Sequence, residues 1–318
     1  MQKVTVSAPG KLHLSGEHAV VYGNPAVVVS TSLRTTVTLE SGASDTSRRS
    51  GTLRKSDTFI DEILKVFEGR YGTSVPDDLA IFISSSVPEG AGMGSSAALA
   101  VALLGACVTF FDKPWDAQRI NELAYQAEKF IHGNPSGSDP AIVTHGGILW
   151  YRKELDFLKT FWLLPFKIPK TFAPFVLINT GRSESTGELV GAVARVKEKD
   201  VNAFMVTLDA VEQVTKSMTQ AIHDENEQDF FEAMKQNERL LEHLGVVSVQ
   251  AKKLIADIEA VGGAAKISGA GGIQTGSGVV IAMHKNPQKM LDLAKKYALP
   301  AFQVVLGGEG VTKVQVIA

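Results

Sequence analysis

The chain has 318 residues and a mass of 34.0 kDa, and 44% of its residues are hydrophobic, which is typical of a soluble globular protein of about two domains. Its 32 lysines and arginines against 34 aspartates and glutamates give a formal net charge of -2, so it lacks the positive excess of non-specific nucleic-acid binders. The single cysteine, Cys107, excludes an intrachain disulfide scaffold and favours a reducing, cytoplasmic location.

The N-terminal half is predicted to mix strands and helices. Valine and threonine alternate in the first 40 residues and predict strands, followed by an exposed loop over 41–55. The longest apolar stretch, over 97–111, is too short to span a bilayer comfortably and predicts a buried helix from about 95 to 111, so no membrane partner is expected. Apolar spacing predicts the remaining elements, which are helices over 57–71 and 116–132 and strands over 79–87 and 146–151.

Prolines at positions 165, 169 and 174 predict a linker over 164–174, and we expect one domain over 1–168 and a second over 169–318. The final strand–strand–helix–strand–strand run predicts a separate sheet in the second domain, in an α+β fold. The predicted helices of this half cover 186–197, 201–223, 228–244, 248–261 and 288–297, and the predicted strands cover 175–179, 265–268, 279–283, 302–306 and 311–317.

A glycine-rich turn leads from a strand into the buried helix, with the sequence Pro88-Glu89-Gly90-Ala91-Gly92-Met93-Gly94-Ser95-Ser96-Ala97. Its glycines leave backbone N–H groups free to face an anion, and the first turn of the helix adds further N–H groups and the positive end of the helix dipole. The turn lacks the Gly-Lys-Ser/Thr ending of a Walker A loop and the spacing of a dinucleotide fingerprint. It predicts a phosphate-binding site, with an ordinary serine N-cap as the structural alternative.

Three further motifs accompany this turn: a Pro-Gly-Lys…Gly-Glu-His-Ala-Val-Val stretch over 8–23, a His-Gly-Asn-Pro-Ser-Gly-Ser-Asp segment over 132–139, and a third glycine turn over 266–272. In this order the four motifs resemble the GHMP kinase superfamily, and within it the mevalonate kinase family. The resemblance spans residues 4–283. It implies a two-domain GHMP kinase fold, with an N-terminal ATP-binding domain like ribosomal protein S5 over 1–168 and a helical, ferredoxin-like domain over 169–318.

The resemblance also implies an activity, the ATP-dependent phosphorylation of the 5-hydroxyl of mevalonate in isoprenoid precursor biosynthesis. Phosphoryl transfer needs in-line positioning and charge neutralisation more than covalent work by the protein. Asp139 ends a loop constrained by proline and glycine, which suits a carboxylate that accepts the hydroxyl proton. Lys11 lies in an apolar strand, where it would need an anionic partner. We expect its partners to be Asp139 and the substrate hydroxyl or the γ-phosphate.

Other residues take their roles from the resemblance. It implies that Ser96 and Glu128 hold a Mg²⁺ ion bridging the ATP phosphates, and such a sparse set of ligands suits Mg²⁺. Arg182 is an alternative partner for the substrate carboxylate. The sequence does not define an oligomeric state, and a homodimer is one option. The residues expected to contact mevalonate are Lys11, Glu17, His18, Ser136, Asp139 and Thr186.

Three alternatives stay open at this stage: a GHMP kinase with another acceptor, a GHMP-fold sensor without turnover, and the related decarboxylase. The presence of all four proposed catalytic and metal-binding side chains argues against a silent sensor, and the Gly-Glu-His-Ala-Val-Val run argues against the decarboxylase. The third glycine turn departs from the family pattern. Members of the family usually continue with four glycines, whereas here Ile273 and Gln274 interrupt the run.

Overall fold

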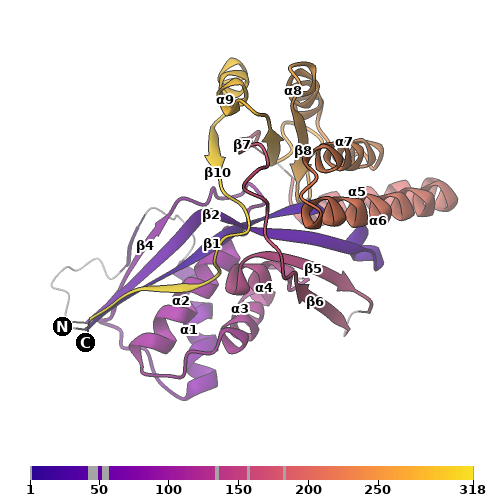
Figure 1. The fold of residues 1–318 in the computed structure, drawn as a ribbon. Coiled ribbons are helices and arrows are strands. Elements are labelled where there is room, and N and C mark those ends of the chain that lie inside the picture. The colour runs from indigo at the N-terminus through magenta and orange to yellow at the C-terminus, as the bar shows by residue number, and fades with distance from the viewer. Residues whose placement is uncertain are drawn as a thin grey trace.

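The computed structural model describes residues 2–41, 49–51, 57–132, 136–155, 158–181 and 184–317. It has the expected α+β fold, built from a seven-stranded and a four-stranded sheet with helices packed on both (Figure 1). The positions of most predicted elements are confirmed. For α1, α6 and β9 the bounds agree residue for residue with the ranges predicted from the sequence, Asp57–Tyr71, Val201–His223 and Val279–Met283.

The larger sheet is built on two long antiparallel strands, β1 (Lys3–Ser15) and β2 (Pro25–Glu40). Its strand order is β11-β1-β2-β4-β3, and a β5–β6 hairpin pairs with the first part of β2. Because β1 and β2 are long, the first sequence motif extends from the larger sheet to the second half of the molecule. The other strands of this sheet are β3 (Arg49–Gly51), β4 (Ala80–Ser85), β5 (Ile148–Lys153), β6 (Lys159–Leu163) and β11 (Thr312–Ile317).

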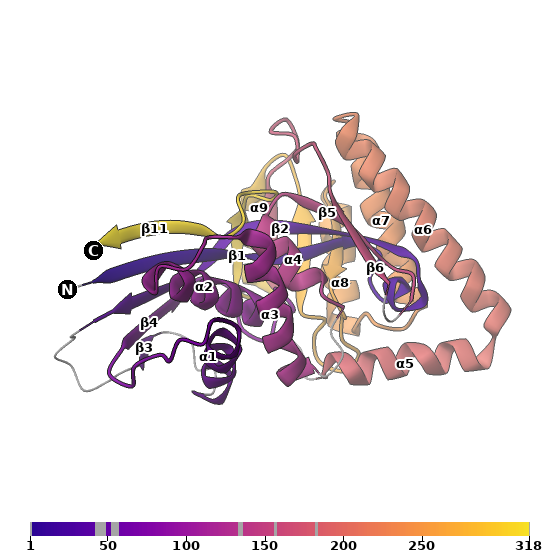
Figure 2. The same cartoon turned by 90° about the horizontal axis from the view of Figure 1, so that it is seen from below.

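Four helices pack together against this sheet (Figures 1 and 2). The helix α2 lies between β1, β2 and the neighbouring helices, which explains why its sequence is apolar on every side. Together with the sheet, these helices form the first hydrophobic core. They are α1 (Asp57–Tyr71), α2 (Ser95–Phe110), α3 (Ala117–His132) and α4 (Ser138–His145).

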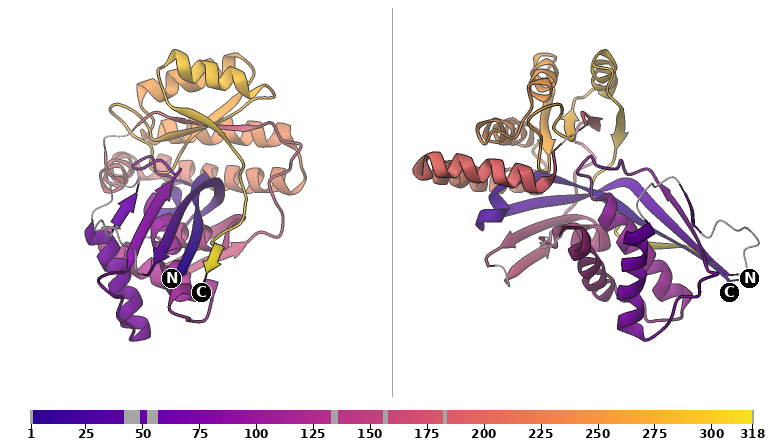
Figure 3. Two further views of the ribbon diagram at one scale, coloured as in Figure 1. Left: turned by 90° about the vertical axis from the view of Figure 1, so that its left-hand side faces the viewer. Right: turned by 180° about the vertical axis from the view of Figure 1, so that it is seen from behind.

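The smaller sheet is antiparallel and has the order β10-β7-β9-β8. Its strands are β7 (Phe175–Asn179), β8 (Ala264–Ser268), β9 (Val279–Met283) and β10 (Ala301–Val304). The C-terminal helices are α5 (Thr186–Lys199), α6 (Val201–His223), α7 (Glu227–His243), α8 (Val249–Ala260) and α9 (Pro287–Lys296). Three of them, α7, α8 and α9, contact the strands of the smaller sheet, whereas α6 packs against α7 and α5 against α6 (Figure 3).

The last strand is in a different sheet from the one the sequence suggested. We expected 311–317 to complete the sheet of the second domain, but β11 pairs antiparallel with β1, with Lys3 opposite Ile317 (Figure 2). The chain therefore returns to the larger sheet after building the smaller one. The division of the chain into domains at 168/169 stays a prediction. In that division, β11 belongs to the second domain by sequence but pairs with a strand of the first.

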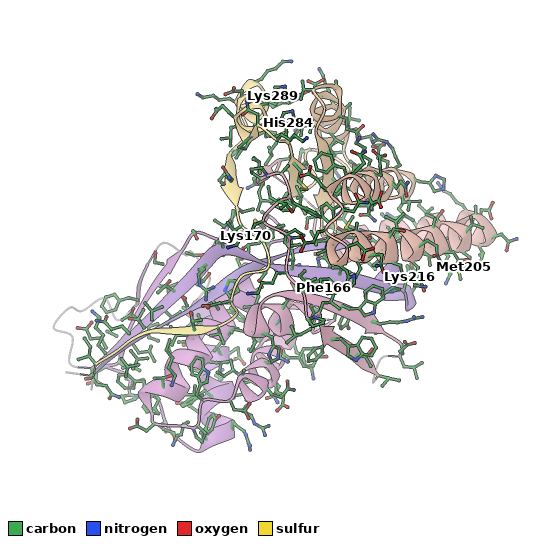
Figure 4. All side chains as sticks on the ribbon, viewed as in Figure 1. Phe166, Lys170, Met205, Lys216, His284 and Lys289 are labelled. Carbon is green, nitrogen blue, oxygen red and sulfur yellow. The ribbon has the colours of Figure 1, made fainter. Side chains whose placement is uncertain are left out.

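Some local elements were not predicted. No local pattern predicted β6 or α4, and β3 lies inside the expected loop over 41–55, most of which is outside the described residues. The expected linker over 164–174 contains no helix or strand. Within it, Phe166 lies beside Lys216 of α6, and the two side chains line a surface hollow together with Trp150 (Figure 4).

A second hydrophobic core joins the two halves of the molecule. It combines Leu12 and Met93 of the first half with Phe175, Phe230 and Ile281 of the second, all of them buried. Because interiors pack densely, this shared core limits movement of the first and second motifs relative to the smaller sheet. None of the helices in the described ranges is long and apolar enough to cross a membrane.

Candidate active site

The centre of the candidate site is an ion pair between the first motif and the start of α4. Lys11 lies on β1, where the pairing register with β2 shifts just after Pro9, and its Nζ is 3.1 Å from Asp139 Oδ2. The Lys11 side chain is only 6% exposed, whereas that of Asp139 is 28% exposed. Asp139 stands in the first turn of α4 and not, as the sequence suggested, at the end of a loop. The ammonium is thus buried while the carboxylate stays accessible.

The second motif lies directly against Lys11. The Lys11 backbone N–H donates to Met93 O at 3.0 Å, and a Cβ added to Gly94 would lie 2.8 Å from Lys11 Cγ. Gly94 also has a φ of +70°, which side chains rarely adopt. Glycine at this position is therefore required both by the backbone and by the close passage of the lysine.

The helix α2 begins at Ser95, and its N-cap residue is Gly94. Within the described residues no side chain accepts a hydrogen bond from the first turn, so the serine N-cap alternative is wrong. Ser95 is buried and Ser96 is half-buried, and they are the first two residues of the helix. An uncapped N-terminus at the end of a glycine turn favours an anion such as phosphate.

The third motif packs against the second. A Cβ on Gly92 would lie 3.8 Å from Ser268 O, at the end of β8, and a Cβ on Gly278, in the segment that follows the third motif, would lie 3.1 Å from Ala91 O. The two glycine turns therefore face each other across the junction of the two sheets. This contact brings residues from opposite ends of the sequence to one place beside Lys11.

The atypical glycine turn folds back on the smaller sheet. Gly272 donates its N–H to Val246 O at 2.9 Å, and a Cβ on Gly276 would lie 2.0 Å from Thr180 O, so no other residue fits there without a shift of the backbone. At the tip, the N–H groups of Ile273 and Gln274 both donate to Glu184 Oε1, at 3.1 and 2.8 Å. The residues that interrupt the glycine run thus form an exposed tip held by a carboxylate of the neighbouring segment.

A buried ion pair joins the first motif to the third. Lys266 on β8 donates from Nζ to Glu17 Oε1 at 2.5 Å, and both side chains are 1% exposed. Glu17 Oε2 has no hydrogen-bond partner among the described residues. Nearby, Glu238 is fully buried and accepts the Ile267 N–H, and burial raises the pKa of Glu238 to about 7.

The other expected substrate residues have different surroundings. His18 is buried, its Nε2–H donates to Ala270 O at 2.9 Å, and burial lowers the pKa of its imidazole. Ser136 Oγ is 2.9 Å from Ser138 Oγ, which donates to Asp139 Oδ1 at 3.3 Å, so both serines adjoin the central pair. Thr186 is an exposed residue at the start of α5. Positions 133–135 and Arg182 lie outside the described residues.

The residues expected to bind Mg²⁺ offer the right donor atoms. Glu128 lies on α3 and is 3% exposed, and Ser96 lies in the first turn of α2, the helix against which α3 packs. A carboxylate and a hydroxyl are hard oxygen ligands of the kind that Mg²⁺ prefers, with phosphate oxygens and water completing its shell. Within the described ranges, no group of three or more histidine, cysteine, aspartate or glutamate side chains forms a metal cage.

Sequence reasoning missed two residues of this site, His13 and Lys266. His13 lies two residues beyond Lys11 on β1, and its Nδ1 is 3.2 Å from Lys11 Nζ. Lys266 is a charged residue between Ala265 and Ile267 in a mostly apolar strand, and the motif alone predicts no role for it. A lysine inside a buried strand signals an anionic partner, but its identity depends on a contact over 249 residues of sequence.

Comparison with known proteins identifies the family of the chain. Residues 58–147 match the model of the GHMP kinases N terminal domain. The chain is 35% identical over 274 residues to mevalonate kinase from Archaeoglobus fulgidus, covering 84% of this chain and 88% of that one. It is 31% identical to mevalonate kinase from Pyrococcus abyssi, covering 93% of this chain and 92% of that one.

Solved structures show the same fold. A crystal structure of L. major mevalonate kinase in complex with R-mevalonate superposes with a TM-score of 0.79 at 23% identity, covering 96% of each chain. Methanococcus jannaschii mevalonate kinase gives a TM-score of 0.78 at 24% identity, covering 96% of this chain and 98% of that one. The matched domain model and the curated relatives make the chain a GHMP kinase. The identity to curated relatives over most of the chain goes further: the chain belongs to the mevalonate kinase family, and it is an enzyme.

The close passage of Lys11 beside Gly94 leads to a stability prediction. Gly90 and Gly94 share a φ of +70°, but a Cβ on Gly90 would meet nothing within 4 Å. Gly90→Ala should therefore cost only the left-handed backbone strain, about 1–2 kcal/mol. Gly94→Ala should cost clearly more in urea unfolding, because its methyl group displaces Lys11. Equal losses in the two variants would contradict the packing described here.

The buried pair of Lys266 and Glu17 leads to a second prediction. Lys266→Met should lower the free energy of unfolding by about 3–5 kcal/mol, because the Glu17 carboxylate is left buried without its counterion. Adding Glu17→Leu should recover part of this loss. As a control, Lys65→Met removes the exposed pair with Glu62 and should leave urea unfolding near that of the wild type. A Lys266→Met loss no larger than the control's would show that the buried pair is dispensable.

Proposed function

We propose that this chain transfers the γ-phosphoryl group of ATP to the 5-hydroxyl of mevalonate and forms 5-phosphomevalonate. Membership of the mevalonate kinase family supports ATP as the phosphoryl donor and mevalonate as the acceptor. The observation that carries the proposal is the pair of buried Lys11 and accessible Asp139, next to the uncapped N-terminus of α2. It brings a proton acceptor, a fixed positive charge and a phosphate-binding turn to one place.

In this proposal Asp139 accepts the proton of the 5-hydroxyl as the oxygen attacks the γ-phosphorus. Its accessibility leaves room for a substrate, and its place in the first turn of α4 favours the negative charge. Lys11, held 3.1 Å away, keeps the carboxylate ionised and offsets the charge that develops on the transferred phosphoryl group. A buried ammonium acts more strongly than an exposed one, because little water screens it.

The turn from Pro88 to Ala97 would hold the ATP phosphates with its backbone N–H groups. Ser96 and Glu128 would hold Mg²⁺, which when bound neutralises charge on the phosphates. Both proposals rest on the N-terminus of α2, which no described side chain caps, and on the oxygen donors of α2 and α3, together with the family resemblance.

We assign the remaining substrate contacts to Glu17, His18, Ser136 and Thr186. The unpartnered Oε2 of Glu17 can accept a hydrogen bond from a substrate hydroxyl, and Ser136 adjoins Asp139 through Ser138. Every proposed residue comes from one chain, so the enzyme can act alone or as a homodimer. The proposal includes a cytoplasmic location and the division into domains 1–168 and 169–318.

An ADP-release assay over mevalonate, phosphomevalonate, galactose and homoserine tests the proposal. Mevalonate should give the highest kcat/KM by a wide margin. Asp139→Asn should lower kcat by about 10²–10⁴-fold, because it removes the proton acceptor while keeping the shape of the side chain.

Two results would contradict the substrate assignment and the assignment of the base separately. If another acceptor is preferred over mevalonate, the substrate is wrong. If Asp139→Asn turns over mevalonate at a rate near that of the wild type, the base is wrong even with the right substrate. Circular dichroism of the variant confirms that the fold is retained.

A further inference from the structure

We propose that His13 is a positioning residue for the Lys11–Asp139 pair. Its neutral imidazole accepts a hydrogen bond from Lys11 at Nδ1 and so fixes the direction in which the ammonium points. The inference rests on the proposed function, because it assigns His13 a part in the same phosphoryl transfer. It adds a residue that acts through Lys11 and does not itself touch the substrate.

The geometry of β1 places His13 and Lys11 side by side. Residues two apart on a strand point to the same face, and His13 Nδ1 is 3.2 Å from Lys11 Nζ. The same Nζ is 3.1 Å from Asp139 Oδ2. A lysine side chain has four flexible carbons and three N–H donors, so one acceptor leaves it free to swing. Two acceptors on different elements fix the ammonium.

The backbone of His13 is itself held by the third motif. Its N–H donates to Ser268 Oγ at 2.9 Å, and its carbonyl accepts from Ser268 Oγ at 3.1 Å and from Lys266 Nζ at 3.4 Å. Ser268 is the last residue of β8 and belongs to the third motif, directly before Gly269. The position of the imidazole therefore depends on the third motif as well as on the first, and His13 connects both to the central pair.

The surroundings of His13 keep it neutral. Burial and the charge of Lys11 lower the pKa of its imidazole to about 3, with Lys266 and His18 acting in the same direction and Asp139 opposing them. An ammonium group can only donate, so Nδ1 must accept and the ring proton must be on Nε2. An imidazolium ion has no acceptor and would repel Lys11, so the arrangement requires the neutral ring.

A neutral acceptor has an advantage at this position. A second carboxylate beside Lys11 would also orient the ammonium, but the carboxylate would neutralise the ammonium charge and repel the phosphates of ATP. A neutral imidazole orients the ammonium and leaves its positive charge for Asp139 and the transferred phosphoryl group. This is the physical reason for a histidine, and not an aspartate or glutamate, two residues after the lysine.

Two variants of His13 test the proposal by steady-state kinetics with ATP and mevalonate. His13→Leu removes the acceptor, and kcat should fall about 10- to 100-fold with little change in either KM. Without a fixed ammonium beside Asp139, the acidic limb of the pH–rate profile of this variant should shift to higher pH. His13→Gln keeps an uncharged acceptor, so it should restore most of kcat and the wild-type position of the acidic limb.

A control and a direct probe separate this role from a structural one. His284 is likewise a hydrogen-bond acceptor at Nδ1, here for the backbone N–H of Asn286, but it lies among the C-terminal helices near Lys289 (Figure 4). His284→Leu should therefore leave the kinetics unchanged. In ¹⁵N-histidine NMR spectra of the wild type, the His13 ring should stay neutral with its proton on Nε2 from pH 7 to pH 5.

Several outcomes would overturn the proposal. His13→Leu with wild-type kcat and pH profile would show that Lys11 needs no second acceptor. A loss that His13→Gln does not restore, in a variant that unfolds at the wild-type temperature, would show that the acceptor is not the reason. Protonation of His13 near pH 6.5 would contradict the neutral ring. If the wild type itself does not phosphorylate mevalonate, the proposed function fails instead, and the NMR result still tests His13.

Discussion

A lysine ammonium buried at the junction of two sheets is the constraint on which the site depends. Removing such an ion from water costs several kcal/mol, so Lys11 must be surrounded by groups that satisfy its three N–H donors and its charge. Asp139 and His13 provide two of these partners. The third donor and the residual charge suit an anionic substrate group. A folding requirement and a catalytic requirement therefore lead to the same arrangement.

The two halves of the chain are held together around this lysine. Gly94 lets the start of α2 approach it, and Ser268 holds the backbone of the neighbouring residue from β8. The buried pair of Lys266 and Glu17 fixes the end of the first motif to the same strand, and a shared apolar core surrounds these contacts. The three motifs lie far apart in sequence, and they meet because each supplies hydrogen-bond, ion-pair or packing contacts to another.

Much of this arrangement could be predicted from the sequence, but not all of it. The bounds of α1 and α6 were predicted to the residue, since each helix has one apolar face and one solvent-exposed face. The order of the motifs indicated Lys11 and Asp139. Sheet membership of β11 could not be predicted, because pairing with β1 joins residues at opposite ends of the chain. Lys266 and His13 were missed for the same reason, since their roles depend on contacts between segments and not on local pattern.

A double-mutant cycle on kcat/KM for mevalonate, with Lys11→Met, Asp139→Asn and the two combined, tests most directly whether the ion pair acts as one catalytic unit. If it does, each single variant already disables the unit, and the double variant should be about as impaired as the worse single one. If the two losses multiply in the double variant, Lys11 and Asp139 contribute independently, and the account of the buried ammonium as the organising charge of the site is wrong.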